Sequence, residues 1–440
     1  MQRNEQLDQI LSNLNIGLLN TMQQTAQKTI LEEKDVLLLA PTGSGKTIAF
    51  LLSVLEQLNA DNKMVQCLIL TPSRELALQI EAVWRKMGTG FKASCCYGGH
   101  SMLTEIQSLT RAPALLIGTP GRIADHIKRK TFDWSRIAML ILDEFDKSLA
   151  LGFHAEMNFI TGKLEHLQKR VLVSATHAIE IPEFTGVTNA TVVDFITERE
   201  SPDTLHLKMV LSQERDKIDC LFQLLCFLRE GSALIFCNHR EAAERSSRLL
   251  KEKGIENACF HGGLEQMERE QTLVQFRNGS IQFLIATDLA ARGLDIPVVK
   301  HVIHYHLPAT AEEFTHRNGR TARMQSAGTA YIILYAQEPL PAYISPTPEE
   351  IVLPAKNPLP KPTSWMTLYI NGGKKDKLNK TDIVGFLSQK GKLEKADLGL
   401  IEVKDFVSFA AVKKHKVKEL LQQVQNEKMK GKKYLIKVAR

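Results

Sequence analysis

The fold of this 440-residue chain is decided by one stretch, Val36-Leu37-Leu38-Leu39-Ala40-Pro41-Thr42-Gly43-Ser44-Gly45-Lys46-Thr47. An apolar strand enters a glycine-rich loop, and an apolar helix begins at Ile48. Glycines let backbone N–H groups converge on phosphate oxygens at a helix N-terminus. Lys46 is placed to reach the terminal phosphates, and the Thr47 hydroxyl to ligate Mg²⁺. The stretch therefore predicts a nucleotide site made by Ala40, Pro41, Thr42, Gly43, Ser44, Gly45, Lys46 and Thr47.

A second apolar run, residues 137–142, ends in the acids Asp143-Glu144-Phe145-Asp146. Asp143 is expected to hold Mg²⁺ through water, and Glu144 to polarise the attacking water. Carboxylates are also favoured at any helix N-terminus, so this pattern is weak by itself. Together with the phosphate loop it predicts an ATPase site with ATP and Mg²⁺ as cofactors.

Short apolar runs alternate with amphipathic helical stretches through two consecutive blocks, residues 1–200 and 201–336. Strands that are apolar on both faces and separated by helices predict parallel sheets covered on both sides. We therefore expect two α/β domains with their chemistry at the carboxyl ends of the strands. A proline-rich stretch at 337–362 is expected to be a stiff interdomain linker, followed by a last domain at 363–440.

Charge is unevenly distributed along the chain. Residues 363–440 contain 18 Lys+Arg and 8 Asp+Glu, a net +10, and the first 362 residues sum to −3. A basic segment on a near-neutral body favours a polyanion-binding tail over a merely solvated basic face. The seven cysteines lack metal-site spacing, and no signal peptide or membrane span is evident, which predicts a cytoplasmic protein with no membrane partner.

The motifs of the first block, read in order, resemble those of the DEAD-box RNA helicases of superfamily 2. They are Pro72-Ser73-Arg74-Glu75-Leu76-Ala77, Gly98-Gly99, Thr119-Pro120-Gly121-Arg122, Asp143-Glu144-Phe145-Asp146 and Ser174-Ala175-Thr176. The second block adds Leu234–Asn238, Ala286-Thr287-Asp288 through Gly293-Leu294-Asp295, and His316-Arg317-Asn318-Gly319-Arg320-Thr321-Ala322-Arg323. The resemblance implies two tandem RecA-like domains and an ATP-dependent RNA helicase.

The resemblance also implies roles for individual residues. His316, Arg317 and Arg320 join Lys46, Asp143 and Glu144 as catalytic residues, and Gly293 and Asp295 contact the nucleotide. Three-residue spacing would place Arg317 and Arg320 on one helical face. The expected RNA path comprises Pro72, Arg74, Gly99, Thr119, Gly121, Arg122, Thr287 and Asp288.

Two positions depart from the family pattern. Gln23 stands where the adenine-reading glutamine lies, but the preceding Leu19-Asn20-Thr21-Met22 is unlike the family's sequence. Phe145 replaces a small alanine between the catalytic acids, and looser or rearranged packing beside Ser174-Ala175-Thr176 is expected.

The tail predicts an α+β domain of ferredoxin-like or RNA-recognition type. Its expected elements are strands 366–370, 399–403, 406–411 and 434–438, a helix from Thr381 to Gln389, and a helix at 415–425. Tyr369, Phe406 and Phe409 are candidates either for base stacking or for the core. The segments 367–378 and 382–385 resemble the DbpA-type RNA-binding domain. That resemblance implies a structured RNA, with large-subunit ribosomal RNA as the leading candidate, and contacts from Lys374 and Lys375.

The function that fits these features is an ATP-dependent RNA helicase, expected to be a monomer, that remodels short structured RNA duplexes, with ribosome assembly as one setting. Two alternatives stay open. One is a DNA-directed helicase of the same superfamily. The other is an RNA chaperone or clamp with weak ATPase activity, to which Phe145 and the atypical residues before Gln23 point.

Overall fold

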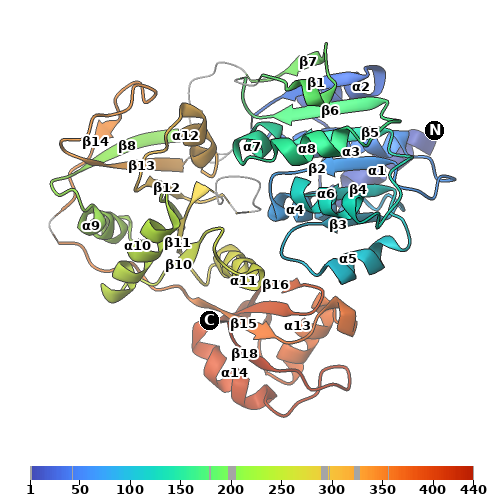
Figure 1. Ribbon diagram of the computed structural model, residues 1–440. Helices are drawn as coiled ribbons and strands as arrows, with labels where there is room; N and C mark the ends of the chain where they lie inside the picture. Colours follow the sequence, from blue (N-terminus) through green and yellow to red (C-terminus); the bar gives the residue numbers. More distant parts are fainter. Residues whose placement is uncertain are drawn as a thin grey trace. The chain divides into compact units, whose positions relative to one another are not determined.

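A computed structural model describes residues 2–41, 43–177, 180–196, 205–288, 296, 298–321, 328–354 and 356–439 (Figure 1). The described residues form two compact units, one within Met1–Glu200 and the other within Ser201–Arg440. Among these residues no helix has the length and apolar character required to cross a bilayer.

The first unit is a seven-stranded sheet with the order β3-β4-β2-β5-β6-β1-β7. Every described pairing in it is parallel. The strands are β1 (Asp35–Leu39), β2 (Cys67–Leu70), β3 (Ala93–Cys96), β4 (Leu115–Gly118), β5 (Met139–Asp143), β6 (Lys169–Ser174) and β7 (Thr191–Asp194). The helices are α1 (Gln2–Leu14), α2 (Thr21–Glu32), α3 (Lys46–Gln57), α4 (Arg74–Met87), α5 (Met102–Leu109), α6 (Pro120–Lys128), α7 (Phe145–Ala150) and α8 (His154–Thr161).

Helices cover both faces of this sheet (Figure 1), which explains why its central strands are apolar throughout. In β2, Cys67 and Ile69 belong to one buried cluster, and Leu68 and Leu70 belong to another. Successive side chains of a strand point to opposite faces of the sheet, so one strand contributes residues to the hydrophobic clusters on both faces.

The second unit contains another seven-stranded sheet, with the order β10-β11-β9-β12-β13-β8-β14 and only parallel pairings among its described strands. The strands are β8 (Leu205–Ser212), β9 (Ala233–Phe236), β10 (Ala258–Phe260), β11 (Phe283–Ala286), β12 (His301–His304), β13 (Gly328–Tyr335) and β14 (Glu349–Glu350). The helices are α9 (Ile218–Leu228), α10 (Arg240–Glu252), α11 (Gln266–Arg277) and α12 (Ala311–Asn318). The two parallel sheets confirm the predicted α/β architecture.

Part of the proline-rich stretch is built into this sheet. Its residues Glu349–Glu350 pair with β8, Ile344 is buried, and Ile351 and Leu353 pack against the core. Apolar side chains among the prolines hold the first half of the segment against the second domain. The rest, up to Pro362, leads into the tail.

The tail folds as the predicted βαββαβ domain, with an antiparallel sheet of order β16-β17-β15-β18. Its elements are β15 (Trp365–Ile370), α13 (Lys380–Gln389), β16 (Leu398–Val403), β17 (Ser408–Lys413), α14 (Val417–Val424) and β18 (Ile436–Val438). The predicted start of the first tail helix was one residue late: the Asn379 side chain accepts a hydrogen bond from the Asp382 N–H, so α13 begins at Lys380 and not at Thr381. The predicted strand 406–411 instead runs from Ser408 to Lys413.

One face of the tail sheet is covered by the end of α11. The Arg277 guanidinium forms a bidentate salt bridge with the Glu402 carboxylate, with N···O distances of 2.8 and 2.9 Å. Asn278 and Thr367, both buried, exchange hydrogen bonds of 2.8 and 3.1 Å. The second domain and the tail therefore share a specific polar contact within one unit.

Candidate active site and nucleic-acid interface

The phosphate loop joins β1 to α3, as the sequence predicts. Gly45 is the N-cap of α3 and has φ of 90°, in the left-handed region. A Cβ at Gly45 would also lie 2.3 Å from the Gln23 amide nitrogen, so only glycine fits there. Lys46 begins the helix and donates hydrogen bonds to the carbonyls of Ala40 and Pro41. Burial lowers the pKa of Lys46, against an opposing effect of Asp143, Glu144 and Asp146.

Gln23 is tied to this loop from the side. It lies on α2 and is 5% exposed. Its side-chain carbonyl accepts the Asn20 N–H at 3.0 Å, and its amide donates to the Gly45 carbonyl at 3.4 Å. Gln23 therefore reaches the nucleotide loop as expected, and it links α2 to that loop. Thr42 lies outside the described residues.

The acids follow β5 at the same edge of the sheet. Asp143 is 4% exposed, and burial, reinforced by the Glu144 charge, raises its pKa to about 7, although Lys46 opposes the shift. Glu144 caps α7 with a φ of 46°, a strained conformation for a residue with a side chain. Strain of this kind costs about 1–3 kcal/mol and is concentrated at functional sites.

Strand order explains why these parts meet. β6 lies between β1 and β5, its residue Val173 is opposite Asp143, and the Ser174 carbonyl accepts the Ala40 N–H at 3.2 Å. The loop at Lys46, the acids and Ser174-Ala175-Thr176 therefore come from three adjacent strand ends. A buried carboxylate whose pKa is raised by burial is stabilised by a cation, so Asp143 and the half-buried Thr47 fit Mg²⁺.

Phe145 is fully packed. Its ring is 1% exposed and lies in the core cluster that includes Leu142, Leu172 and Met157. The surrounding apolar residues enclose the larger ring, so the packing at this position is not loosened, and rearranged packing beside Ser174-Ala175-Thr176 stays a prediction.

The first-unit residues expected to contact RNA follow three adjacent strands, β3, β4 and β2. Ser73 caps α4 through a hydrogen bond from Leu76, which places Arg74 in the first helical turn. A Cβ at Gly99, whose φ is 83°, would lie 2.3 Å from the Arg74 guanidinium. The Arg122 guanidinium donates to the His100 carbonyl at 2.7 Å. The structure therefore brings Arg74, Gly99 and Arg122 together, with Pro72, Thr119 and Gly121 in the same loops.

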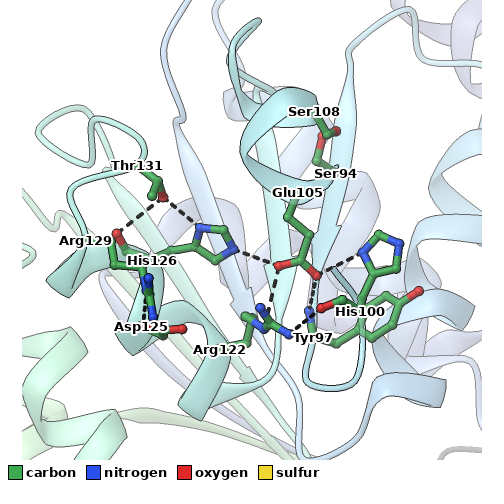
Figure 2. A network of polar contacts seen from close by, with 10 residues as sticks. All are labelled: Ser94, Tyr97, His100, Glu105, Ser108, Arg122, Asp125, His126, Arg129 and Thr131. Atoms are coloured by element: carbon green, nitrogen blue, oxygen red, sulfur yellow. Dashed lines mark hydrogen bonds and ion pairs between the residues drawn. The ribbon is translucent and has the colours of Figure 1, made fainter. Parts of the chain in front are cut away.

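Sequence reasoning missed Glu105, which lies on α5 and is 1% exposed (Figure 2). It contacts both the loop after β3 and helix α6. An acid on the buried face of a short helix was the available signal, because an unpaired carboxylate is not tolerated there.

Arg317, expected to be catalytic, is engaged inside the second domain. Its side chain is 0% exposed, and its Nε and Nη2 donate to Asp288 at 2.7 and 2.8 Å. Further hydrogen bonds reach the His306 carbonyl at 2.6 Å and the Asn238 side chain at 2.9 Å. The arrangement braces the strand ends around Arg317, and it also engages Asp288, which was expected to contact RNA.

The expectation of one helical face was also wrong. α12 ends at Asn318, and Gly319 is its C-cap, so Arg320 lies beyond the helix. His316 and Arg320 are both buried, and the Thr287 N–H binds the Phe260 carbonyl at 3.3 Å. Gly293, Asp295 and Arg323 lie outside the described residues.

In the tail, Lys374 and Lys375 are exposed on a 3₁₀ turn, Lys374–Asp376. Their backbone N–H groups donate to the Lys404 and Asp405 carbonyls, both at 2.8 Å. Phe409 is 1% exposed, packs edge-on against Tyr369, and belongs to the interior. Phe406 is 60% exposed.

Two parallel sheets carrying a phosphate loop and paired acids, followed by a basic α+β domain, define a nucleic-acid-dependent ATPase of the helicase class. Three family models match the chain: DEAD/DEAH box helicase over residues 20–184, helicase conserved C-terminal domain over 216–325, and DbpA RNA binding domain over 367–438. The chain belongs to the DEAD-box ATP-dependent RNA helicases, in the DbpA group that carries this C-terminal domain.

Relatives of known name support this membership. The chain is 34% identical to the ATP-dependent RNA helicase DbpA of Escherichia coli, covering 96% of this chain and 95% of the relative. It is 30% identical to DbpA of Bacillus subtilis, covering 93% and 92%. Among solved structures, it is similar to S. cerevisiae Dbp5 bound to RNA and ADP BeF3, with a TM-score of 0.67 and 28% identity over 76% of this chain and 88% of the other.

Proposed function

We propose that this helicase hydrolyses ATP with Mg²⁺ and uses the cycle to open short duplexes in a structured RNA. The observation that carries the proposal is the convergence of Lys46, Asp143 and Glu144 at the ends of β1 and β5, the two strands that flank β6 in one sheet. The E. coli and B. subtilis relatives are named ATP-dependent RNA helicases, which supports the assignment.

In the proposed mechanism Lys46 releases its contacts with the Ala40 and Pro41 carbonyls and binds phosphate oxygens instead. Asp143 and Thr47 would hold Mg²⁺, which would supply positive charge beside the phosphates. Glu144, fixed at the start of α7, orients the attacking water. Gly43, Ser44 and Gly45, with Thr42 in the same loop, are proposed to present backbone N–H groups to the phosphates, and Ala40 and Pro41 form the start of that loop.

We assign the catalytic positive charge of the second domain to Arg320, with His316 four residues before it in sequence. Arg317 is assigned a bracing role, because its guanidinium already has carboxylate, carbonyl and amide partners. Gln23, Gly293 and Asp295 are proposed to contact the base and sugar of ATP.

We further propose that Arg74, Gly99 and Arg122, with Pro72, Thr119, Gly121 and Thr287, bind the RNA backbone. Contacts to phosphate and sugar position a strand without reading its sequence. The tail adds Lys374 and Lys375, and its match to the DbpA RNA binding domain supports a structured RNA as target, with large-subunit ribosomal RNA as the leading candidate. We expect the protein to act as a monomer. Seven free cysteines suit a reducing compartment such as the cytoplasm.

The test is RNA-stimulated ATPase activity in the full chain and in Glu144→Gln. The variant removes the group that orients water and leaves Lys46 in place. ATP binding should therefore persist while turnover falls by at least about a hundredfold, the usual size of general-base catalysis. Equal turnover in the two proteins would refute the mechanism. Stimulation by single-stranded DNA equal to that by RNA would instead favour the DNA-directed alternative.

A further inference from the structure

Glu105 is the centre of a buried polar network in the first unit (Figure 2). Both of its oxygens are in use, and each receives contacts from a different segment. Oε1 accepts the Tyr97 N–H at 3.1 Å and lies 3.3 Å from His100 Nδ1. Oε2 lies 2.8 Å from His126 Nε2 and 3.7 Å from Arg122 Nε.

These contacts join two segments that are distant in sequence. Tyr97 and His100 flank Gly98-Gly99 in the loop after β3, and Arg122 and His126 lie on α6. Arg122 also donates directly to the His100 carbonyl at 2.7 Å, which closes the connection. The carboxylate therefore fixes the loop that carries Gly99 relative to the helix that carries Arg122.

His126 supports the carboxylate from the interior. It is 0% exposed, and its Nδ1 lies 2.7 Å from the Thr131 hydroxyl. Because a carboxylate only accepts hydrogen bonds, His126 Nε2 carries a proton in this arrangement. The ring, held by Thr131, thus keeps Glu105 pointed at Arg122.

The same region offers three ligand types for a metal ion. Ligand atoms of Cys96, Glu105 and His126 lie within 4.8 Å of one another. Arg122, however, already occupies the Glu105 oxygen beside His126, and burial raises the pKa of the Cys96 thiol. A guanidinium and a metal cation would repel each other at that oxygen, so the cluster is better described as a polar brace.

We propose that Glu105 is a positioning residue for RNA binding. Its carboxylate holds Arg122 and the loop that carries Gly99 in the relative position that binds one RNA backbone. This inference rests on the proposed RNA contacts of Gly99 and Arg122. Fixed donors bind a phosphate without losing rotamer freedom at the moment of binding.

The direction of the change in RNA affinity distinguishes a positioning role of Glu105 from a simple effect of its charge. Glu105 is negative and lies beside the proposed path of a polyanion, so neutralising it would strengthen RNA binding if only charge mattered. Positioning predicts weaker binding. Glu105→Gln keeps the shape and an acceptor for the Tyr97 N–H, and its amide can donate to His126 once the ring proton moves to Nδ1. His100 keeps the Oε1 acceptor, and Arg122 loses the carboxylate oxygen that faces it.

The experiment compares the full-length parent, Glu105→Gln and the control Glu165→Gln, which makes the same charge change at an exposed position of the first unit. The RNA concentration for half-maximal ATPase should rise about three- to tenfold in Glu105→Gln, the effect of removing one partner of the Arg122 ion pair. The maximal rate at saturating RNA should match that of the parent, and the variant should be folded at the assay temperature, which its thermal unfolding midpoint checks. The control should show no rise.

An unchanged or lower half-maximal RNA concentration in Glu105→Gln would overturn the inference. Absence of RNA stimulation in the parent would instead overturn the proposed function, so the two failures are distinguishable. If Glu105→Gln does not fold, His126→Gln takes its place, because it removes the support behind Glu105 while keeping the Arg122 pair. It should shift the RNA concentration in the same direction, and no shift would again overturn the inference.

Discussion

Replacing either partner of the Arg317–Asp288 pair should loosen the second domain before it affects catalysis directly. Arg317 is fully enclosed and makes four hydrogen bonds, two of them to Asp288. Breaking a buried pair from one side costs about 3–5 kcal/mol, because the remaining charge is left uncompensated. Each 1.4 kcal/mol is a factor of about ten in an equilibrium constant. Arg317→Gln and Asp288→Asn should therefore each raise the local opening constant by about a hundredfold or more.

The assay is native-state hydrogen exchange of the full chain, read on peptides that contain β12 and its following loop. Local exchange is preferred because a chain of several domains does not unfold in one step. The double variant should be less destabilised than the sum of the singles by about 0.5–3 kcal/mol, since neither charge is then left alone. Arg248→Gln, at an exposed position on α10, is the matched control. Loss of turnover in Arg317→Gln with unchanged exchange would refute the bracing role and restore Arg317 as a catalytic arginine.

Two further predictions follow from buried side chains. Phe145→Ala should lower the free energy of unfolding of the first domain by about 3–5 kcal/mol, because the ring is fully buried. The substitution should also change the number of duplexes opened per ATP hydrolysed more than it changes ATP affinity. Urea unfolding measures the first effect and a coupled unwinding assay the second, and an unchanged number of duplexes per ATP would show that Phe145 serves packing alone. Burial, reinforced by the charge of Arg317, lowers the pKa of His304 to about 3. Between pH 6.5 and pH 3 the unfolded chain therefore binds a proton that the folded chain does not. The free energy of unfolding should fall across this range, as the pH drops, by up to about 1.4 kcal/mol per pH unit. His304→Gln, which keeps a donor for Asn318, should flatten this dependence relative to the parent, and an identical pH profile would contradict the assignment.

The sequence was most informative where structure is local. A strand, a glycine loop and a helix at 36–57 are contiguous, so the position of Lys46 followed from the chain alone. Apolar runs likewise predicted both parallel sheets. Two of the predictions that failed in detail depended on helix ends. α12 stops at Asn318, which removes Arg320 from the helix, and a capping asparagine moves the start of α13.

Contacts between distant segments could not be read from spacing. Glu105 and His126 are 21 residues apart, and Arg317 and Asp288 are 29 apart. Only the folded sheet decides which strand ends are neighbours. The same holds for the tail, where the apolar residues Tyr369 and Phe409 were compatible with stacking or with burial until the sheet face was placed.

The tail is expected to select where the motor works, with little effect on the chemistry. Cutting the chain at Pro360 should raise the RNA concentration for half-maximal ATPase severalfold and leave the maximal rate nearly unchanged. That cut also removes Glu402 and Thr367, the partners of Arg277 and Asn278, so a truncated protein confounds lost RNA contacts with an exposed domain face.

A double substitution, Lys374→Gln with Lys375→Gln, separates these effects. Both side chains are exposed, and the turn is held by backbone hydrogen bonds to residues 404 and 405, so the fold does not depend on the ammonium groups. If both lysines contact phosphates, the slope of log affinity against log salt should fall by about 1.4–1.8, at 0.7–0.9 per contact. Lys28→Gln with Lys63→Gln makes the same charge change at exposed positions of the first unit, and it should leave the slope unchanged. If the two double variants changed the slope equally, diffuse positive charge would explain the binding, and Lys374 and Lys375 would make no specific contacts with RNA.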